Sequence, residues 1–458
     1  MFSKDRNRDM TSGPLFVNIL MFSLPIMAMN ILQLLFNAAD MVVVGRFSGK
    51  EALAAVGATS SLINLIVTLA MGFSVGTSVV IAQNYGANKE LELNRSVHTS
   101  IAISVISGFI VMVIGLLFCK PLLEMMGTPN DIIHLSVLYM RIYFVGIPAT
   151  MVYNFGAAIL RAIGDSRRPM YYLVIAGIVN VVLNLIFITQ FNMSVDGVAW
   201  ATTISQFISA TLILICLYRS HGAIRFIPKQ LRIHKQQLKD IMRVGIPAGL
   251  QSFLFSISNV LIQSSVNSFG STMVAASSAS SNIEGFAGTT VNAYYNAAIS
   301  FTGQNMGAKK YDRIDSIAKI CTILVFVTWF IVGGALMVFG KQLLGIYSSD
   351  PVVIELGYMR MRIMMMLHFT NGIMIVFPGL TRAMGYSILP MLSTLVGACI
   401  ARIVWIYTVF AWNPTPFTLF ICYPVTWALA GMGQVAIFLY ARKQIRKRNT
   451  IEIQSVTA

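Results

Sequence analysis

The chain has 458 residues, of which 56% are hydrophobic and only 11% are charged, and its mean hydropathy is +0.73. Soluble domains carry about 25% charged residues, so this composition excludes a soluble protein and indicates an integral membrane protein. The net charge of +16 is spread over many short polar segments instead of one cluster, which excludes a nucleic-acid-binding face.

Twelve apolar segments are long enough to cross the hydrocarbon core of a bilayer as helices, which takes about 20 residues each. The first segment, of about 31 residues, is longer than the apolar core of a secretory signal peptide and lacks a cleavage site, so we expect it to be retained. The sequence therefore predicts an all-α integral membrane protein with twelve transmembrane helices. They span residues 15–45, 54–82, 97–118, 134–159, 170–190, 197–218, 244–268, 273–303, 317–340, 352–380, 388–411 and 417–440.

The distribution of lysine and arginine predicts the orientation of these segments, because cytoplasmic loops are enriched in positive charge. With a cytoplasmic N-terminus, 25 of the 33 basic residues fall in cytoplasmic segments. Four others fall in outside loops and four within the apolar segments, the last being Arg141, Arg360, Arg362 and Arg402. We therefore expect a multi-pass protein of the cell membrane with both termini in the cytoplasm.

The first apolar segment carries a polar stripe and a proline. Asn30, Gln33, Asn37 and Asp40 follow one another at intervals of three and four residues, which places them on one face of a helix. A charged carboxyl group in hydrocarbon costs at least about 2.5 kcal/mol, so Asp40 is a candidate functional group. Pro25 is the candidate hinge, because a proline inside a helix removes a hydrogen bond and favours a bend.

Later segments of the first half offer polar partners for this stripe. Asn180 and Asn184 lie one turn apart in the fifth segment, and Thr202 lies in the sixth. Amides and hydroxyls also bond routinely between packed membrane helices, so interhelical packing is the competing interpretation. The acid on the stripe favours a functional site. Amides that are candidates for lining a substrate cavity are Asn30, Gln33, Asn37 and, in the fourth segment, Asn154.

Residues 219–243 form the longest polar interruption and predict a cytoplasmic linker between two lobes. Six spans lie on each side of it, and because six is an even number both halves enter the membrane from the same side as parallel repeats. On this division the chain consists of a cytoplasmic tail (1–14), an N-lobe (15–218), the linker (219–243), a C-lobe (244–440) and a basic cytoplasmic tail (441–458).

The seventh and eighth segments carry the candidates of the C-lobe. Pro247 falls at the predicted start of the seventh segment, where a proline is tolerated without a bend. Ser256, Asn259 and Gln263 form a neutral polar stripe suited to lining a substrate path. Glu284 in the eighth segment is the second acid within a span, and a functional role and a water-accessible entrance opened by nearby serines are both open interpretations.

The two halves repeat each other. Residues 83–89, Gln-Asn-Tyr-Gly-Ala-Asn-Lys, return 221 positions later as residues 304–310, Gln-Asn-Met-Gly-Ala-Lys-Lys. Residues 161–164 return at the same offset as residues 382–385. The glycine and lysine of the longer motif predict a helix end at the membrane surface. A duplication of this period indicates two related lobes that enclose a shared site.

The polar residues are not all duplicated. At the corresponding offset Asn37 matches Asn259, but Asp40 matches Ile262 and Asn180 matches Ala401. An acid present in one lobe only suggests that this lobe binds a coupling ion.

The sequence indicates transport without a nucleotide or a cofactor. Residues 45–51 lack the spacing of a phosphate-binding loop. The five cysteines are scattered singly, without metal-ligand spacing. We therefore expect neither an enzyme nor a bound metal or cofactor, and an ion gradient as the source of energy.

Short segments shared with a known family are distributed over essentially the whole chain. They are Leu24-Pro25, Asp40 followed by Gly45, residues 52–57, the two Gln-Asn-x-Gly-Ala stretches, residues 161–165 with Pro169, and residues 197–202. Together they resemble the multidrug and toxic compound extrusion (MATE) family of secondary transporters, nearest to its DinF-like branch. The resemblance implies two six-helix bundles forming a V, alternating access and cation-driven export of amphipathic, often cationic compounds.

The resemblance also implies a site. It places the cation-coupling residues at Asp40, Asn180, Asn184 and Thr202. Many relatives have an aspartate at the position of Asn184, and with one carboxylate instead of two we favour protons over sodium. Some relatives have an arginine two residues before the acid of the eighth segment; here that residue is Asn282, so Glu284 would lack that partner.

The predicted function is export of amphipathic or cationic drugs in exchange for H+, or less favourably Na+, by a monomer in the cell (inner) membrane. Its partners would be drug-like small molecules and the lipid bilayer. The alternative is a flippase for a lipid-linked saccharide from the same wider superfamily. That activity would need basic residues in the cavity, for which only the four arginines within the spans are candidates.

Overall fold

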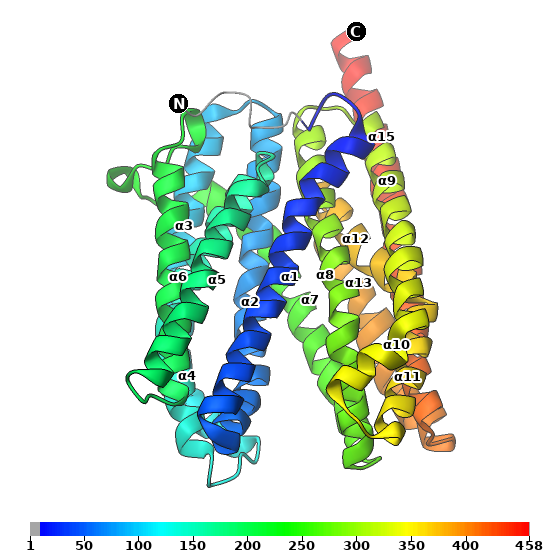
Figure 1. The fold of residues 1–458 in the computed structure, drawn as a ribbon. Coiled ribbons are helices and arrows are strands. Elements are labelled where there is room, and N and C mark those ends of the chain that lie inside the picture. Colours follow the sequence, from blue (N-terminus) through cyan, green and yellow to red (C-terminus); the bar gives the residue numbers. More distant parts are fainter. Residues whose placement is uncertain (1–9, 458) are drawn as a thin grey trace. The chain divides into compact units, whose positions relative to one another are not determined.

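All regular structure in the part of the chain that the computed structural model describes, residues 10–457, is helical. The helices form two compact units, each drawn in Figure 1. Unit 1 holds residues 24–249, and unit 2 holds residues 10–23 and 250–457 of the described chain. The all-α fold class predicted from the sequence is confirmed.

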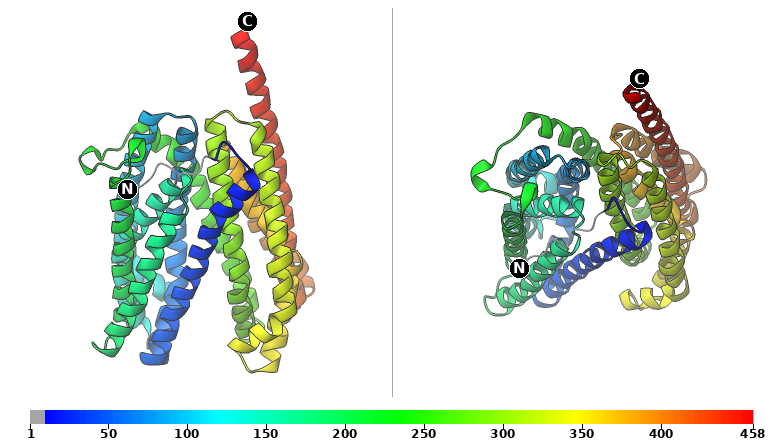
Figure 2. Two further views of the ribbon diagram at one scale, coloured as in Figure 1. Left: turned by 45° about the horizontal axis from the view of Figure 1, so that its top comes forward. Right: turned by 90° about the horizontal axis from the view of Figure 1, so that it is seen from above.

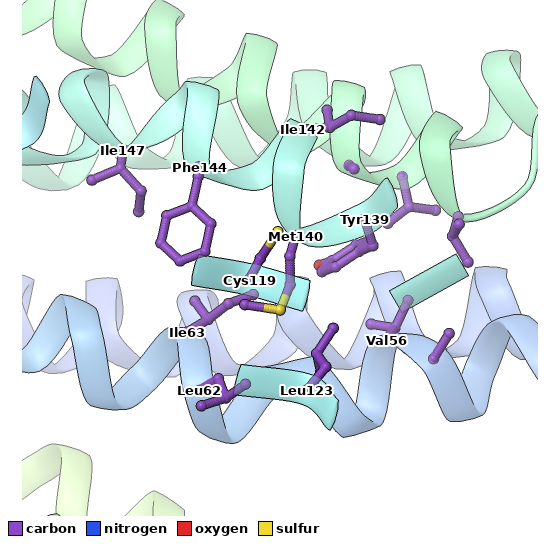
Figure 3. Packing of buried hydrophobic residues seen from close by; sticks show 14 of the residues in the cluster. Val56, Leu62, Ile63, Cys119, Leu123, Tyr139, Met140, Ile142, Phe144 and Ile147 are labelled. Atoms are coloured by element: carbon purple, nitrogen blue, oxygen red, sulfur yellow. The ribbon is translucent and has the colours of Figure 1, made fainter. Parts of the chain in front are cut away.

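Unit 1 is built around its fourth helix, α4, which packs against α2, α3 and α6, while α5 packs against α6. Glycines allow this close packing, because a side chain at Gly115 would overlap the ring of Phe144 on α4. Figure 3 shows this core, in which residues 139–147 of α4 face apolar side chains of α2 and α3. The helices are α1 (Leu15–Phe47), α2 (Gly49–Gly86), α3 (Glu90–Met125), α4 (Ile133–Ala162), α5 (Arg167–Thr189) and α6 (Val195–Tyr218).

Unit 2 is centred on α12, which packs against α8, α9 and α15. Several of its spans are composite, with π-helical turns (η4, η5, η6) inside two of them. The helices are α7 (Lys235–Asn267), α8 (Ser271–Gly307), α9 (Asp312–Thr328), η4 (Trp329–Gly333), α10 (Gly334–Tyr347), α11 (Pro351–Met366), α12 (His368–Ala383), α13 (Ile388–Thr394), η5 (Leu395–Ile400), α14 (Ala401–Trp405), η6 (Ile406–Phe410) and α15 (Pro416–Thr457).

All twelve predicted spans lie in helices of the described chain. Ten helical spans are long and apolar enough to cross a membrane, and α11 and α12 form an eleventh that is bent by 52°. The remaining predicted span, 273–303, lies in α8, whose 37 residues include many serines and asparagines. Its length suits a membrane helix, and its many polar side chains indicate that it packs against other helices and not against lipid.

The repeated motif ends a helix in both units. α2 ends at Gly86 and α8 at Gly307, and the next residues but one, Asn88 and Lys309, adopt the left-handed conformation with φ of 53° and 57°. The backbone N–H of Lys89 donates to Asn84 O at 3.1 Å, and the matching bond in unit 2 is 2.8 Å. This is the hydrogen-bonding pattern that closes a helix C-terminus, so the predicted helix ends are confirmed.

The predicted position of Pro247 at the start of its helix is wrong. α7 begins at Lys235, twelve residues earlier and inside the predicted linker, so Pro247 lies in the helix interior as Pro25 does in α1. The first turns of α7 carry polar side chains, so a search for apolar segments does not include them and places the start of the helix too late.

The linker before α7 is held on α3 by hydrogen bonds. It contains η2 (Gly222–Ile224) and η3 (Pro228–Gln230). The Asn94 amide donates to Ala223 O at 3.1 Å, and the backbone N–H of Ile227 donates to His98 Nε2 at 3.2 Å. At the other end of the chain, α15 extends beyond the other helices of unit 2 through the predicted C-terminal tail (Figure 2).

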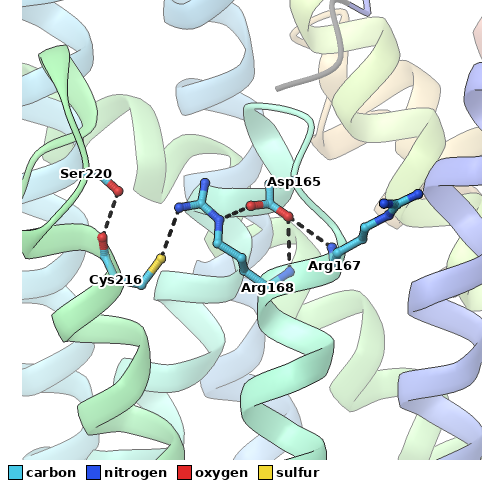
Figure 4. A network of polar contacts seen from close by, with 5 residues as sticks. All are labelled: Asp165, Arg167, Arg168, Cys216 and Ser220. Atoms are coloured by element: carbon cyan, nitrogen blue, oxygen red, sulfur yellow. Dashed lines mark hydrogen bonds and ion pairs between the residues drawn. The ribbon is translucent and has the colours of Figure 1, made fainter. Parts of the chain in front are cut away.

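A buried aspartate organises the turn between α4 and α5. Asp165 Oδ1 accepts the backbone N–H groups of Arg167 and Arg168, at 3.0 and 3.1 Å, which satisfies the first turn of α5. Its other oxygen pairs with the Arg168 guanidinium, which also donates to Cys216 Sγ on α6 at 3.3 Å (Figure 4). Asp165 is 6% exposed, so its removal would leave these donors without a partner in a buried place.

We expect Asp165→Ala to lower the free energy of unfolding by about 1–3 kcal/mol, because it removes a helix cap and a buried ion-pair partner. Equilibrium unfolding of the purified protein in mixed micelles measures this change. Asp131→Ala is the matched control, since Asp131 is exposed in the same unit and its loss should cost less than about 0.5 kcal/mol. Equal effects of the two substitutions would contradict the capping role.

Candidate functional site

The four residues predicted as the coupling site lie together in unit 1. Asn184 on α5 donates from Nδ2 to Asp40 Oδ1 on α1 at 2.5 Å. With the Asn180 amide turned so that its NH2 group faces Asp40, it donates to Oδ1 at 2.9 Å. Its carbonyl then accepts from Thr202 Oγ1 on α6 at 3.2 Å. Three helices therefore meet through one chain of hydrogen bonds that begins at the carboxylate.

A glycine places α1 close enough to α5 for these bonds to form. Gly177 lies one turn before Asn180 on α5, and a Cβ atom there would overlap the ring of Phe36. Phe36 lies one turn before Asp40 on α1. The ring therefore sits where α5 has no side chain, and the next turns of the two helices face each other with their polar groups. Sequence reasoning missed this pair, because a single glycine in an apolar segment has no distinctive pattern.

The site combines one carboxylate with neutral donors and acceptors. Asn180 is 5% and Asn184 1% exposed, so both amides are removed from water. Asn184 Oδ1 is a buried acceptor without a hydrogen-bond partner among the described residues. No group of three or more His, Cys, Asp or Glu that could hold a metal ion occurs in the described part of the chain. The arrangement can hold and release a proton on one carboxylate, and it offers few charged ligands to a metal ion.

Thr203, next to Thr202, shows the packing role that was the competing interpretation. Its Oγ1 donates to Ile142 O on α4 at 3.0 Å, which joins two helices away from the carboxylate. Thr203 thus packs α6 against α4, whereas the adjacent Thr202 faces the Asp40 cluster.

The residues predicted to line a substrate cavity are divided between the two units. In unit 1, Gln33 and Asn37 are exposed, Asn30 is half-buried, and Asn154 donates to Thr150 O on its own helix at 2.8 Å. In unit 2, the bonds are Ser256 Oγ to Ser252 O at 3.0 Å, Gln263 Nε2 to Asn267 Oδ1 at 3.1 Å, and Arg402 Nη1 to Asn259 Oδ1 at 2.7 Å. The exposed amides on α1 keep their hydrogen-bonding groups available to a ligand.

Glu284 has a partner that the sequence did not indicate. Position 282 is an asparagine, but Arg360 reaches Glu284 from α11 and pairs with Oε2 at 3.2 Å. Ser280 donates to the other carboxylate oxygen at 2.6 Å, and Arg360 also donates to Ser277 O at 3.1 Å. The only available signal was the presence of an arginine inside an apolar segment. Glu284 is thus charge-compensated, whereas Asp40 receives hydrogen bonds from neutral amides.

Comparisons with known proteins agree with this architecture. The family model described as MatE matches residues 25–186 and 247–408, one match in each half of the chain. The probable multidrug resistance protein YoeA of Bacillus subtilis is 28% identical over 381 residues, covering 81% of both chains. The multidrug export protein MepA of Staphylococcus aureus is 22% identical and covers 81% of this chain and 82% of its own. A crystal structure of a MATE protein in complex with MaL6 is similar with a TM-score of 0.89 at 23% identity, over 98% of this chain and 100% of that one.

We expect Asp40 and Asn184 to be energetically coupled. In a double-mutant cycle of Asp40→Ala and Asn184→Ala, the double variant should lose less unfolding free energy than the sum of the two single losses, by about 0.5–3 kcal/mol. The reason is that the first substitution already removes the bond between the two residues. Equilibrium unfolding in mixed micelles gives the four values. Asp165→Ala with Asn184→Ala is the control cycle and should be additive within about 0.5 kcal/mol, since Asp165 lies just before the start of α5 and Asn184 lies in its last two turns. Additivity in both cycles would contradict the contact.

Proposed function

The chain belongs to the MatE family, and from this membership we propose that it is a secondary active multidrug efflux transporter, an antiporter that exports amphipathic or cationic drugs in exchange for protons. The observation that carries the proposal is Asp40, an acid inside an apolar helix whose carboxylate is bonded to neutral amides of a second helix. The names of the matched relatives, a probable multidrug resistance protein and a multidrug export protein, support drugs as the substrates.

Protons are favoured over sodium as the coupling ion because Asp40 is the one carboxylate of the cluster. Sodium binding by protein ligands needs several oxygens in a closed shell, as for other hard cations. The position that would supply a second carboxylate is Asn184, whose Nδ2 donates to Asp40. Glu284, the other acid within a span, is paired with Arg360 in unit 2. That pairing also favours drug export over flipping of a lipid-linked saccharide. A flippase would need basic side chains in its cavity, and the charge of Arg360, one of the few within the spans, is already neutralised by Glu284.

The transport cycle follows from the change of charge on Asp40. A hydrogen bond to a carboxylate is stronger than one to a neutral carboxyl group, so protonation weakens the link between α1 and α5. Helix α1 then repacks, with Pro25 as the hinge, because the proline leaves one backbone carbonyl without its helical partner. The division between the compact units falls between residues 23 and 24, directly beside this proline. Proton uptake from outside and drug release to the outside therefore belong to the same, outward-facing half of this cycle.

The same proposal includes the setting of the protein. Both termini lie in the cytoplasm, in agreement with the excess of basic residues in the segments assigned there. The protein acts as a monomer in the cell membrane, because each chain carries both members of the repeat.

We expect Asp40→Asn to abolish proton-driven efflux. In inverted membrane vesicles, where efflux from the cell appears as uptake into the lumen, ethidium uptake driven by a pH gradient should fall at least about tenfold, because the amide preserves the shape of the side chain but cannot exchange a proton. A parallel measurement with a sodium gradient and no pH gradient should show no drug movement in the unmodified protein. Glu51→Gln is the control, since Glu51 is an exposed acid at the start of α2, and it should transport normally.

Undiminished proton-driven efflux by Asp40→Asn would refute the coupling role of Asp40. Efflux driven by sodium alone would replace the proton by sodium as the coupling ion.

A further inference from the structure

Unit 2 contains an arginine that is buried more completely than any other charged side chain of the described chain. Arg402 is 1% exposed and is the largest fully buried side chain. It lies on α14, a single turn of α-helix between the π-helical turns η5 and η6. π-Helical turns inside membrane-length helices frequently mark functional sites, because they rotate the side chains that follow them. The local backbone therefore departs from regular geometry on both sides of this arginine.

The guanidinium of Arg402 is held by neutral groups alone. Nη1 donates to Ser258 Oγ at 3.1 Å and to Asn259 Oδ1 at 2.7 Å, and Nε donates to Thr426 Oγ1 at 3.3 Å. The rings of Phe255 and Tyr423 lie 4.7 and 4.8 Å from its central carbon. Nη2 has no hydrogen-bond partner among the described residues, and the side chain forms no ion pair with any of them.

The neighbouring charges do not compensate Arg402. Arg360 approaches the same Tyr423 ring, at 6.0 Å, and its own charge is balanced by Glu284. The cluster of Arg402, Arg360 and Glu284 therefore carries two positive charges and one negative charge. A guanidinium remains charged in proteins, and a charge buried without a counter-charge is strongly unfavourable. An anion at the free Nη2 atom would supply the missing charge and the missing hydrogen bond.

The repeat places Arg402 beside the residues of unit 2 that correspond to the proposed coupling site in unit 1, since Arg402 itself matches Val181, the residue after Asn180. Asn259 on α7 matches Asn37 on α1, and Ala401, next to Arg402, matches Asn180 on α5. The carboxylate of unit 1 thus lies on α1, whereas the guanidinium of unit 2 lies on α14, the counterpart of α5. Of the residues that contact the guanidinium, Asn259, Phe255 and Tyr423 are only partly buried, so an anion would approach Arg402 from their side.

We propose that Arg402, with Asn259 and Thr426, forms a binding site in unit 2 for one small anionic group, a chloride ion or the carboxylate of a small amphipathic molecule. The site is separate from the coupling site at Asp40. It goes beyond the proposed drug/proton exchange, and it can be tested without any transport measurement.

Thermal unfolding of the full-length purified protein tests this site. The unfolding midpoint is recorded in a chloride-free buffer while sodium chloride or, separately, sodium benzoate is added. We expect the midpoint to rise with at least one of the two anions and to saturate, because a ligand that binds only the folded state stabilises it. Saturation by chloride identifies an inorganic anion, and tighter binding of benzoate identifies an organic carboxylate. No saturable rise with either anion would overturn the proposal.

Variants show whether Arg402 is responsible. Arg402→Gln should weaken the anion dependence at least about tenfold, the loss expected for one charge-assisted hydrogen bond. Arg362→Gln is the matched control, since Arg362 is an exposed arginine on α11 of the same unit, and it should respond as the unmodified protein does. An unchanged response of Arg402→Gln would overturn the assignment and leave Arg402 a packing residue.

A third variant covers the case in which Arg402→Gln does not fold. Arg402→Lys keeps the positive charge but has no second guanidinium nitrogen to bind the anion. It should therefore still bind the anion, with a lower apparent affinity than the unmodified protein and the Arg362→Gln control. Equal affinity in Arg402→Lys and the unmodified protein would show that the guanidinium geometry plays no part, and would overturn the site as described.

Discussion

Charged and hydrogen-bonding side chains in the hydrocarbon core have no water to bind, so each of them must find its partners within the protein. In unit 1 this requirement joins α1 to α5 through Asp40 and Asn184. In unit 2 it joins α8 to α11 through Glu284 and Arg360, and α14 to α7 through Arg402 and Asn259. Apolar packing tolerates small rotations of a helix about its axis, whereas these polar contacts do not. They therefore determine which face each helix presents to its neighbours.

The first helix of each repeat has parts in both units. Residues 10–23, which include the start of α1, belong to unit 2, where Met10 O accepts a hydrogen bond from Asn305 at 3.0 Å and Phe22 packs edge-on against Phe301. The start of α7 belongs to unit 1, where Gly249 approaches Gly72 so closely that neither could carry a side chain. Any displacement of one unit must therefore be absorbed within α1 and α7. The prolines at 25 and 247 lie within three residues of these divisions.

The sequence predicted what depends on period and composition, and it missed what depends on contacts between helices. Polar side chains at helical spacing within apolar segments made Asp40, Asn180 and Asn184 candidates, and the repeat added that the acid has no counterpart in the other half; both patterns are visible in one dimension. The partner of Glu284 was missed because Arg360 lies 76 residues away on another helix. The early start of α7 was missed for a different reason. Its first turns carry polar side chains, so they resemble the linker and not a membrane-spanning segment. Twelve segments were found because bilayer thickness sets the length of each one.

The two units use one scaffold for two kinds of charge. A carboxylate such as Asp40 can gain and lose a proton, so the charge of its site changes and the hydrogen bonds that depend on it change in strength. A guanidinium does not lose its proton in proteins, so the charge of Arg402 is permanent. Duplication supplied equivalent helices, and the differences at Asp40 and Arg402 made one site switchable and the other constant. A switchable charge suits the proposed coupling to an ion gradient, and a permanent charge suits the proposed binding of an anion, so the two proposals assign different tasks to the two repeats.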